Sequence, residues 1–242
     1  MTAVADAVIT LDVDWAPDAI IDDVASLLIE RRVRTTWFVT HQSPAIDRLR
    51  LRPDLFELGI HPNMLSGSTH GRTEDEVLAH VLTIVPGARA MRTHGLYQTS
   101  NFLVKAAAGF GIGVDVSLFL PRAPHLQPHA LTYGGATLWR IPYFWEDDVE
   151  MFDESPIWTR DDRRLAVPGL RVFDFHPVHV AVNTERFAQY DGMRKERPLH
   201  TWDRAYIDAG IRKGPGPRSL FLELADSLAG RGRFVTELAG LE

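Results

Sequence analysis

Short apolar runs alternate with amphipathic stretches along most of this chain. Residues 7–13 are apolar and β-branched, which is the pattern of a buried strand. Pro17 then opens a stretch in which apolar side chains recur at helical spacing as far as Arg31 and Arg32. Residues 34–40 are rich in aromatic and β-branched side chains and predict a second strand. The N-terminal part of the chain therefore predicts a strand, a helix and a second strand, in that order.

The same alternation predicts the elements that follow. Further strands are expected at residues 55–60, 90–93, 113–118, 131–145, 170–175 and 234–238, with a turn at Gly134 and Gly135. Further helices are expected at residues 44–51, 73–85 and 100–110, and Ser219 is expected to cap a final helix that ends near Gly230. Thr73 and Glu76 have the spacing of a capping box. Residues 192–198 and 214–217 are expected to be loops with a helix between them.

The repeated alternation of strands and helices implies a mainly parallel sheet. The sequence contains no repeat and no low-complexity linker, so we expect one α/β domain over residues 1–242. The expected architecture is an irregular (β/α) barrel of about seven parallel strands. In folds of this kind the chemistry lies at the C-terminal ends of the strands, which directs attention to the polar residues there.

Composition narrows the classes of partner and compartment. The chain lacks cysteine, which excludes disulfides, thiolate metal sites and a cysteine nucleophile. The formal net charge is -6 with no long basic run, which argues against a nucleic-acid partner. No segment reaches the ~20 apolar residues of a membrane span, and residues 1–9 lack the pattern of a signal peptide. We therefore expect a cytoplasmic protein, and its oligomeric state is left open.

The first expected strand ends in two carboxylates, Asp12 and Asp14. Alternation along a strand puts both on the same side. Carboxylates at the end of an apolar strand are costly to bury unless a positive partner such as a divalent metal is present. One would bind the metal while the other takes a proton from water. The alternative interpretation is that they belong to the N-terminal cap of the following helix, where aspartate is common.

Two histidines, His61 and His70, follow the third expected strand and its polar loop. Two neutral imidazoles and one carboxylate form a common catalytic zinc site with a position left open for water. Only a loop can bring these two side chains together, because they do not have helical spacing. The alternative is that each is a structural or exposed histidine.

Arg92 and His94 lie at the end of the fourth expected strand. An arginine in this place can pair with a catalytic carboxylate and hold it ionised. The alternative for Arg92 is a surface salt bridge, which contributes little to stability. His94 is expected to contact substrate, or else to be a core histidine bonded to backbone.

The late strand leads into His176 and, three residues on, His179. His176 is placed to act as a general acid toward a leaving amine, and His179 is its rival for that role. Trp145 and Asp148 form a weaker pair of candidates, as a substrate wall and a carboxylate that tunes a neighbour. An exposed acidic loop is the alternative for that segment.

These residues, in this order, resemble the polysaccharide deacetylase family, carbohydrate esterase family 4, in a divergent branch. The family has two adjacent aspartates at the end of its first strand, and here Val13 separates them. Its histidine pair has three residues between, whereas eight separate His61 from His70. A proline usually follows two residues after its third-motif arginine, where this chain has His94. The late histidine matches in Phe-His-Pro at His176, and Trp145 and Asp148 loosely match the fourth motif.

The resemblance implies a metal-dependent hydrolase that removes an N-acetyl group from an amino sugar. It assigns Asp12 as general base, Asp14 as metal ligand with His61 and His70, Arg92 as the partner of the base, and His176 as acid. The implied cofactor is one divalent ion, Zn²⁺ in the first place, although Co²⁺, Ni²⁺ and Fe²⁺ suit the same ligands. Without an export signal, we expect a small soluble N-acetylated sugar as substrate.

Two other functions remain open at this point. Relatives with this fold also open cyclic amides, so a metal-dependent hydrolase of a non-sugar amide is the first alternative. The second is a non-catalytic carbohydrate-binding protein that keeps the fold, which the altered histidine spacing favours. Asp12, Arg92 and His176 together argue for catalysis, because binding alone requires no pair of base and acid.

Overall fold

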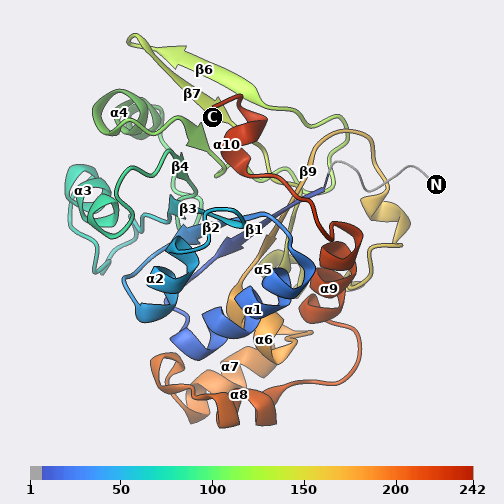
Figure 1. Ribbon diagram of the computed structural model, residues 1–242. Helices are drawn as coiled ribbons and strands as arrows, with labels where there is room; N and C mark the ends of the chain where they lie inside the picture. Colours follow the sequence, from blue (N-terminus) through green and yellow to red (C-terminus); the bar gives the residue numbers. More distant parts are fainter. Residues whose placement is uncertain (1–6, 242) are drawn as a thin grey trace.

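The computed structural model describes residues 7–241, and its strands form one sheet (Figure 1). The strands are β1 (Ala7–Asp12), β2 (Thr35–Val39), β3 (Phe56–Ile60), β4 (Ala90–Met91), β5 (Val114–Asp115), β6 (His129–Tyr133), β7 (Ala136–Arg140), β8 (Trp145–Glu146) and β9 (Arg171–Phe175). Their order is β6-β7-β5-β4-β3-β2-β1-β9-β8, and every neighbouring pair is parallel except the hairpin β6–β7. The α/β class is confirmed. The sheet is related to a barrel, but it is open, because its two edge strands β6 and β8 do not pair with each other.

The helices follow the strands along the chain. They are α1 (Asp18–Arg31), α2 (Pro44–Arg50), α3 (Glu74–Ile84), α4 (Ser100–Phe110), α5 (Asp147–Glu150), α6 (Pro177–Val182), α7 (Phe187–Glu196), α8 (Arg204–Gly210), α9 (Pro217–Ser227) and α10 (Val235–Leu238), with 3-10 turns η1 (Arg163–Leu165) and η2 (Leu199–Thr201). The predicted capping box of α3 is present, since Thr73 and Glu76 exchange side-chain and backbone hydrogen bonds. None of the helices in residues 7–241 is long and apolar enough to cross a membrane.

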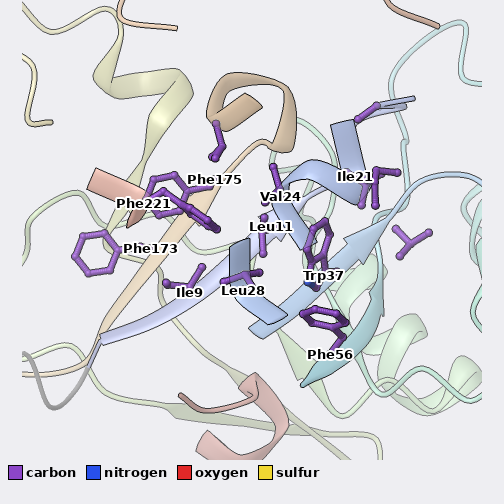
Figure 2. Packing of buried hydrophobic residues seen from close by; sticks show 14 of the residues in the cluster. Ile9, Leu11, Ile21, Val24, Leu28, Trp37, Phe56, Phe173, Phe175 and Phe221 are labelled. Atoms are coloured by element: carbon purple, nitrogen blue, oxygen red, sulfur yellow. The ribbon is translucent and has the colours of Figure 1, made fainter. Parts of the chain in front are cut away.

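The main hydrophobic core lies between the sheet and one group of helices. Figure 1 shows α1, α2, α6 and α9 gathered on one side of the sheet, with α7 and α8 beyond them. In Figure 2, Leu11 of β1 lies beside Val24 of α1, Ile9 of β1 lies toward Leu28 of the same helix, and Phe175 of β9 lies beside Phe221 of α9. These side chains are at most 1% exposed. Burying each such side chain contributes roughly 1.5–3 kcal/mol, so this face holds the strands in register.

The opposite face of the sheet is smaller and partly polar. Alternate residues of β1 point there, so Val8 joins a second apolar cluster whereas Thr10 and Asp12 are buried polar groups. Val235 of α10 also packs into this cluster. The apolar residues cover the part of this face away from the C-terminal ends of the strands, and charged side chains occupy the C-terminal edge.

Three local predictions near the C-terminus are corrected by the structure. Residues 234–238 form a helix and not a strand, because the Glu237 carboxylate accepts the backbone N–H of Phe234 at 3.0 Å and caps it. Residues 192–196, expected in a loop, complete α7, where Asp191 and Lys195 form an i,i+4 pair at 2.6 Å.

The third correction concerns the start of α9. It begins at Pro217, since Gly216 is the N-cap and the proline ring has the φ that a first helical position needs. Ser219 lies within the first turn, where its hydroxyl accepts the Gly216 N–H at 3.3 Å. The residue predicted as the cap thus takes part in capping from the third helical position.

Candidate active site

Polar side chains gather where the parallel strands end. Asp12 is the last residue of β1, and His61, Arg92, Asp147 and His176 directly follow β3, β4, β8 and β9. Parallel strands end at one edge of a sheet, so these side chains share the edge at which sequence analysis expects the chemistry.

The turn after β1 directs Asp14 and Trp15 toward this edge. Both have positive φ angles, 44° and 56°, a left-handed conformation that non-glycine residues adopt rarely and at a cost. The backbone N–H of Trp15 donates to Thr40 Oγ1 at 3.1 Å and helps to hold the turn. His61 Nε2 then lies 3.2 Å from Asp14 Oδ1 and 3.6 Å from Asp12 Oδ2. The turn, and not strand alternation, brings the two aspartates to one side.

Asp14, His61 and His94 present three ligand atoms to one point. Asp14 Oδ1 lies 3.0 Å from His94 Nδ1 and 3.2 Å from His61 Nε2, and the two ring nitrogens are 3.3 Å apart. Ligands about 2.0–2.1 Å from a tetrahedral zinc ion are about 3.3 Å from one another. Asp14 Oδ1 is buried from solvent, and these two imidazoles are its nearest polar partners. The donor set and its spacing therefore fit a divalent ion.

The charge state of Asp14 also suits a ligand. Burial raises the pKa of its carboxyl, but hydrogen bonds from His61 and His94 outweigh burial and hold the pKa well below its ordinary value. The carboxylate is thus ionised at neutral pH, which is the form that binds a metal.

His70 lies apart from this group. Its Nδ1 accepts a hydrogen bond from the backbone N–H of Asn63 at 3.1 Å, and its ring stacks on His80 with the centroids 5.4 Å apart. Burial and His80 lower the pKa of His70 to about 4, so the ring is neutral. The structure does not bring this predicted ligand to Asp14, because its loop directs the ring to backbone, and His94 stands there instead.

Arg92 places a buried positive charge between two carboxylates. It donates to Asp12 Oδ1 at 2.9 Å and also to Asp174. The guanidinium lies over the rings of Phe38 and Tyr143, 4.7 and 4.6 Å from their centroids. Burial raises the pKa of Asp174 well above its ordinary value, although Arg92 opposes this. Arg92 thus orients Asp12, and Asp174 is a partner to which sequence analysis assigns no role.

His176 is held by a second unassigned carboxylate, Asp147. Asp147 is fully buried and accepts His176 Nδ1–H at 2.7 Å and the backbone N–H of the same residue at 2.9 Å. Burial lowers the pKa of His176, but the charges of Asp148 and Asp147 outweigh it and raise the pKa well above its ordinary value. The other ring nitrogen, Nε2, lies 3.6 Å from Asp14 Oδ2. A protonated imidazole therefore faces the group formed by Asp14, His61 and His94.

The remaining predicted residues lie farther from Asp14. His179 Nε2 pairs with Asp148 Oδ1 at 2.7 Å, and its Nδ1 lies 3.2 Å from Thr184 Oγ1, so both its nitrogens are engaged. Trp145 is 1% exposed and packs in the hydrophobic core. It is too deeply buried to form the substrate wall that sequence analysis expects of it.

Glu146 is a further acid beside the site. Tyr143 donates to its Oε2 at 2.8 Å. Burial raises the pKa of Glu146 to about 7, while the nearby charge of His176 lowers it. A carboxyl group that titrates near neutral pH is typical of functional sites.

A cavity of about 560 Å³ opens beside this group. Its lining combines the β1 turn, the fourth strand end and the segment around η2, with residues Asp14, Trp15, His94, Tyr190, Arg194, Pro198, Leu199 and His200. The volume lies in the range of small-molecule sites, roughly 300–1,000 Å³. Aromatic rings and acid–base groups together suit a sugar-sized ligand.

The fold and the carboxylate–histidine groups at its strand ends define the class as an α/β protein with a candidate hydrolytic site. A family model described as WbmS-like polysaccharide deacetylase matches residues 9–194. The chain is similar to a Bordetella bronchiseptica protein assigned as a polysaccharide deacetylase involved in O-antigen biosynthesis. Identity is 31%, coverage is 92% of this chain and 90% of that chain, and the TM-score is 0.78. This chain therefore belongs to the WbmS-like polysaccharide deacetylase family.

A second similarity concerns the fold alone. The 4-alpha-glucanotransferase of Thermococcus litoralis aligns with a TM-score of 0.54 at 9% identity, over 97% of this chain and 38% of that chain. A search of curated proteins finds no significant match. Family membership supports a hydrolytic deacetylase with a sugar substrate, and the Asp and His groups described above could bind a metal.

Proposed function

We propose that this protein is a zinc-dependent hydrolase that removes the acetyl group from an N-acetylated sugar. One observation carries the proposal: Asp14, His61 and His94 converge beside both a carboxylate held by Arg92 and an imidazole held by Asp147. This combination supplies a metal-binding group, a base and an acid at one edge of the sheet, which is what hydrolysis of an amide requires.

Asp14, His61 and His94 would hold the ion. When bound there, a zinc ion would polarise the acetyl carbonyl and acidify a water molecule. Co²⁺, Ni²⁺ and Fe²⁺ suit the same donors. The two ring nitrogens and one carboxylate oxygen leave a fourth tetrahedral position for water or substrate.

Asp12 and His176 would move the protons. Asp12, oriented by Arg92, takes a proton from the water that adds to the acetyl carbon. The C–N bond then breaks as His176, held by Asp147, gives its Nε2 proton to the leaving nitrogen. The products are acetate and the free amino sugar.

We expect the purified protein to release acetate from N-acetylated sugars in a reaction that chelator abolishes and added Zn²⁺ or Co²⁺ restores. The measurement is an acetate assay over a panel of acetylated monosaccharides, oligosaccharides and nucleotide sugars, with metal content determined on the same sample. Cyclic imides in the same panel test the alternative amide substrate. Bound metal with imide opening and no acetate would favour that alternative, whereas absence of both metal and turnover would favour a non-catalytic binding protein.

A pair of matched variants tests the ligand set. Because His94 and not His70 stands beside Asp14, His94→Ala should lower bound zinc from about one ion per chain to nearly none. His70→Ala should retain the ion. This variant is the matched control, because it also removes a histidine side chain, but from a neighbouring loop. The readout is zinc content after dialysis, with circular dichroism to show that both variants are folded. Loss of zinc from His70→Ala with retention in His94→Ala would restore His70 as the ligand.

A further inference from the structure

The outer wall of the active-site cavity comes from one segment of the chain. Tyr190 and Arg194 of α7, followed by residues 198–200 around η2, line it opposite the β1 turn. Tyr190 is buried, and its ring lies 4.8 Å from that of His179. The charges of Arg194 and of Asp14 both act on its phenol. Tyr190 and Arg194 thus share one cavity with Asp14.

Arg194 differs from its basic neighbours in having no acidic partner among the residues that the structure describes. Lys195 pairs with Asp191 at 2.6 Å, and Arg197 pairs with Asp203 at 3.0 Å. Within residues 7–241, no ion pair or hydrogen bond involves Arg194, whose guanidinium lies 5.3 Å from the centroid of the Tyr190 ring. Its charge is therefore available to a ligand in the cavity.

The rest of the cavity wall offers this charge no compensation. Asp14 is the one acidic residue in the lining, and its carboxylate is already in contact with His61 and His94. His200 adds a further group able to donate a hydrogen bond on the same wall as Arg194. An ion bound at Asp14 would make the cavity still more positive, so the cavity favours a ligand with a negative charge away from its acetamido group.

We propose that Arg194, assisted by His200, binds an anionic group on the N-acetylated sugar. The substrate class is an acidic amino sugar, and this inference rests on the proposed deacetylase function. A guanidinium donates two parallel hydrogen bonds to a carboxylate or to a phosphate, so the shared chemistry is a planar or tetrahedral oxyanion. A sugar carboxylate and a sugar phosphate are the two sources that an experiment must separate.

Calorimetric binding to the Asp12→Asn protein, loaded with zinc, tests the proposal without turnover. The ligands are N-acetylglucosamine, N-acetylglucosamine 1-phosphate and the corresponding 6-carboxylate, N-acetylglucosaminuronic acid. We expect at least one of the acidic sugars to bind about tenfold more tightly than the neutral one, with a preference that weakens at high salt. Whichever acid shows the preference identifies the source of the charge.

Arg194→Met should reduce the affinity for the acidic sugar to that of the neutral one and leave the neutral sugar unaffected. Lys195→Met is the matched control, because Lys195 is adjacent on α7, is exposed and does not line the cavity. Arg194→Lys keeps the charge and should retain part of the preference. Equal affinities for all three ligands in the parent protein, or a preference that survives Arg194→Met, would overturn the proposal.

The two proposals fail in different ways. If no sugar of the panel yields acetate, the deacetylase function is wrong, yet the calorimetric preference still reports whether Arg194 binds an anion. If neutral sugars are deacetylated and no acidic preference exists, the deacetylase stands and the role of Arg194 is rejected.

Discussion

Replacing Asp12 by asparagine is expected to lower kcat by about 10³-fold while one metal ion stays bound. A positioned general base contributes roughly 10²–10⁴-fold, and an amide cannot accept the proton. Asp12 lies 3.6 Å from His61, beyond the 3.0–3.3 Å contacts among Asp14, His61 and His94, so the candidate metal group should not depend on it. The fold should survive, because Arg92 keeps its contact with Asp174.

The measurement is steady-state acetate release together with zinc content of the same sample. Asp22→Asn is the control, since it makes the same change on the exposed side of α1. Loss of zinc in Asp12→Asn would show that Asp12 is a ligand and would exchange the roles of the two aspartates. Unchanged turnover would remove Asp12 from the mechanism.

The second large effect is expected from Asp147→Asn. His176 must carry a proton to act as acid, and its pKa is raised, so activity persists below that pKa and falls as pH rises through it. Removing the charge of Asp147 lowers this pKa, and the alkaline limb of the kcat profile should move to lower pH by about 1–3 units. Asp148 still raises the pKa in the variant, so the limb is shifted and not abolished.

A pH–rate profile of Asp147→Asn beside that of Asp161→Asn checks this expectation. Asp161 is an exposed aspartate in the segment that follows α5, and it pairs with Arg160 at 3.6 Å. An alkaline limb that stays in place would mean that another group, with His179 as the first candidate, donates the proton.

Much of the fold could be predicted from local pattern. The strands that end at Asp12 and Phe175, the helix after Pro17 and the capping box at Thr73 all agree with the structure. Apolar periodicity and cap chemistry act over a few residues, so they can be recognised in an isolated sequence. The prediction of a strand at 234–238 is wrong because the β-branched residues of this segment suit a strand, whereas the carboxylate of Glu237 caps a helix.

Some residues of the candidate site could likewise be predicted from local pattern, and others could not. Position at a strand end marks Asp12, His61, Arg92 and His176 as candidates, because parallel strands end at one edge whatever the loops do. Asp174 could also be recognised as a candidate, because it is a charged residue inside an apolar strand, two positions before His176.

Only the tertiary structure decided which side chains meet. The choice between His94 and His70 beside Asp14 depends on how a loop directs each ring, and Asn63 engages the ring of His70. The free charge of Arg194 in the cavity likewise depends on the packing of α7. The sequence by itself therefore determined most of the strands, the polar residues at their ends and the family resemblance. Loop and helix packing decided the candidate metal group and the cavity wall, because those contacts join residues far apart in the chain and leave no local pattern.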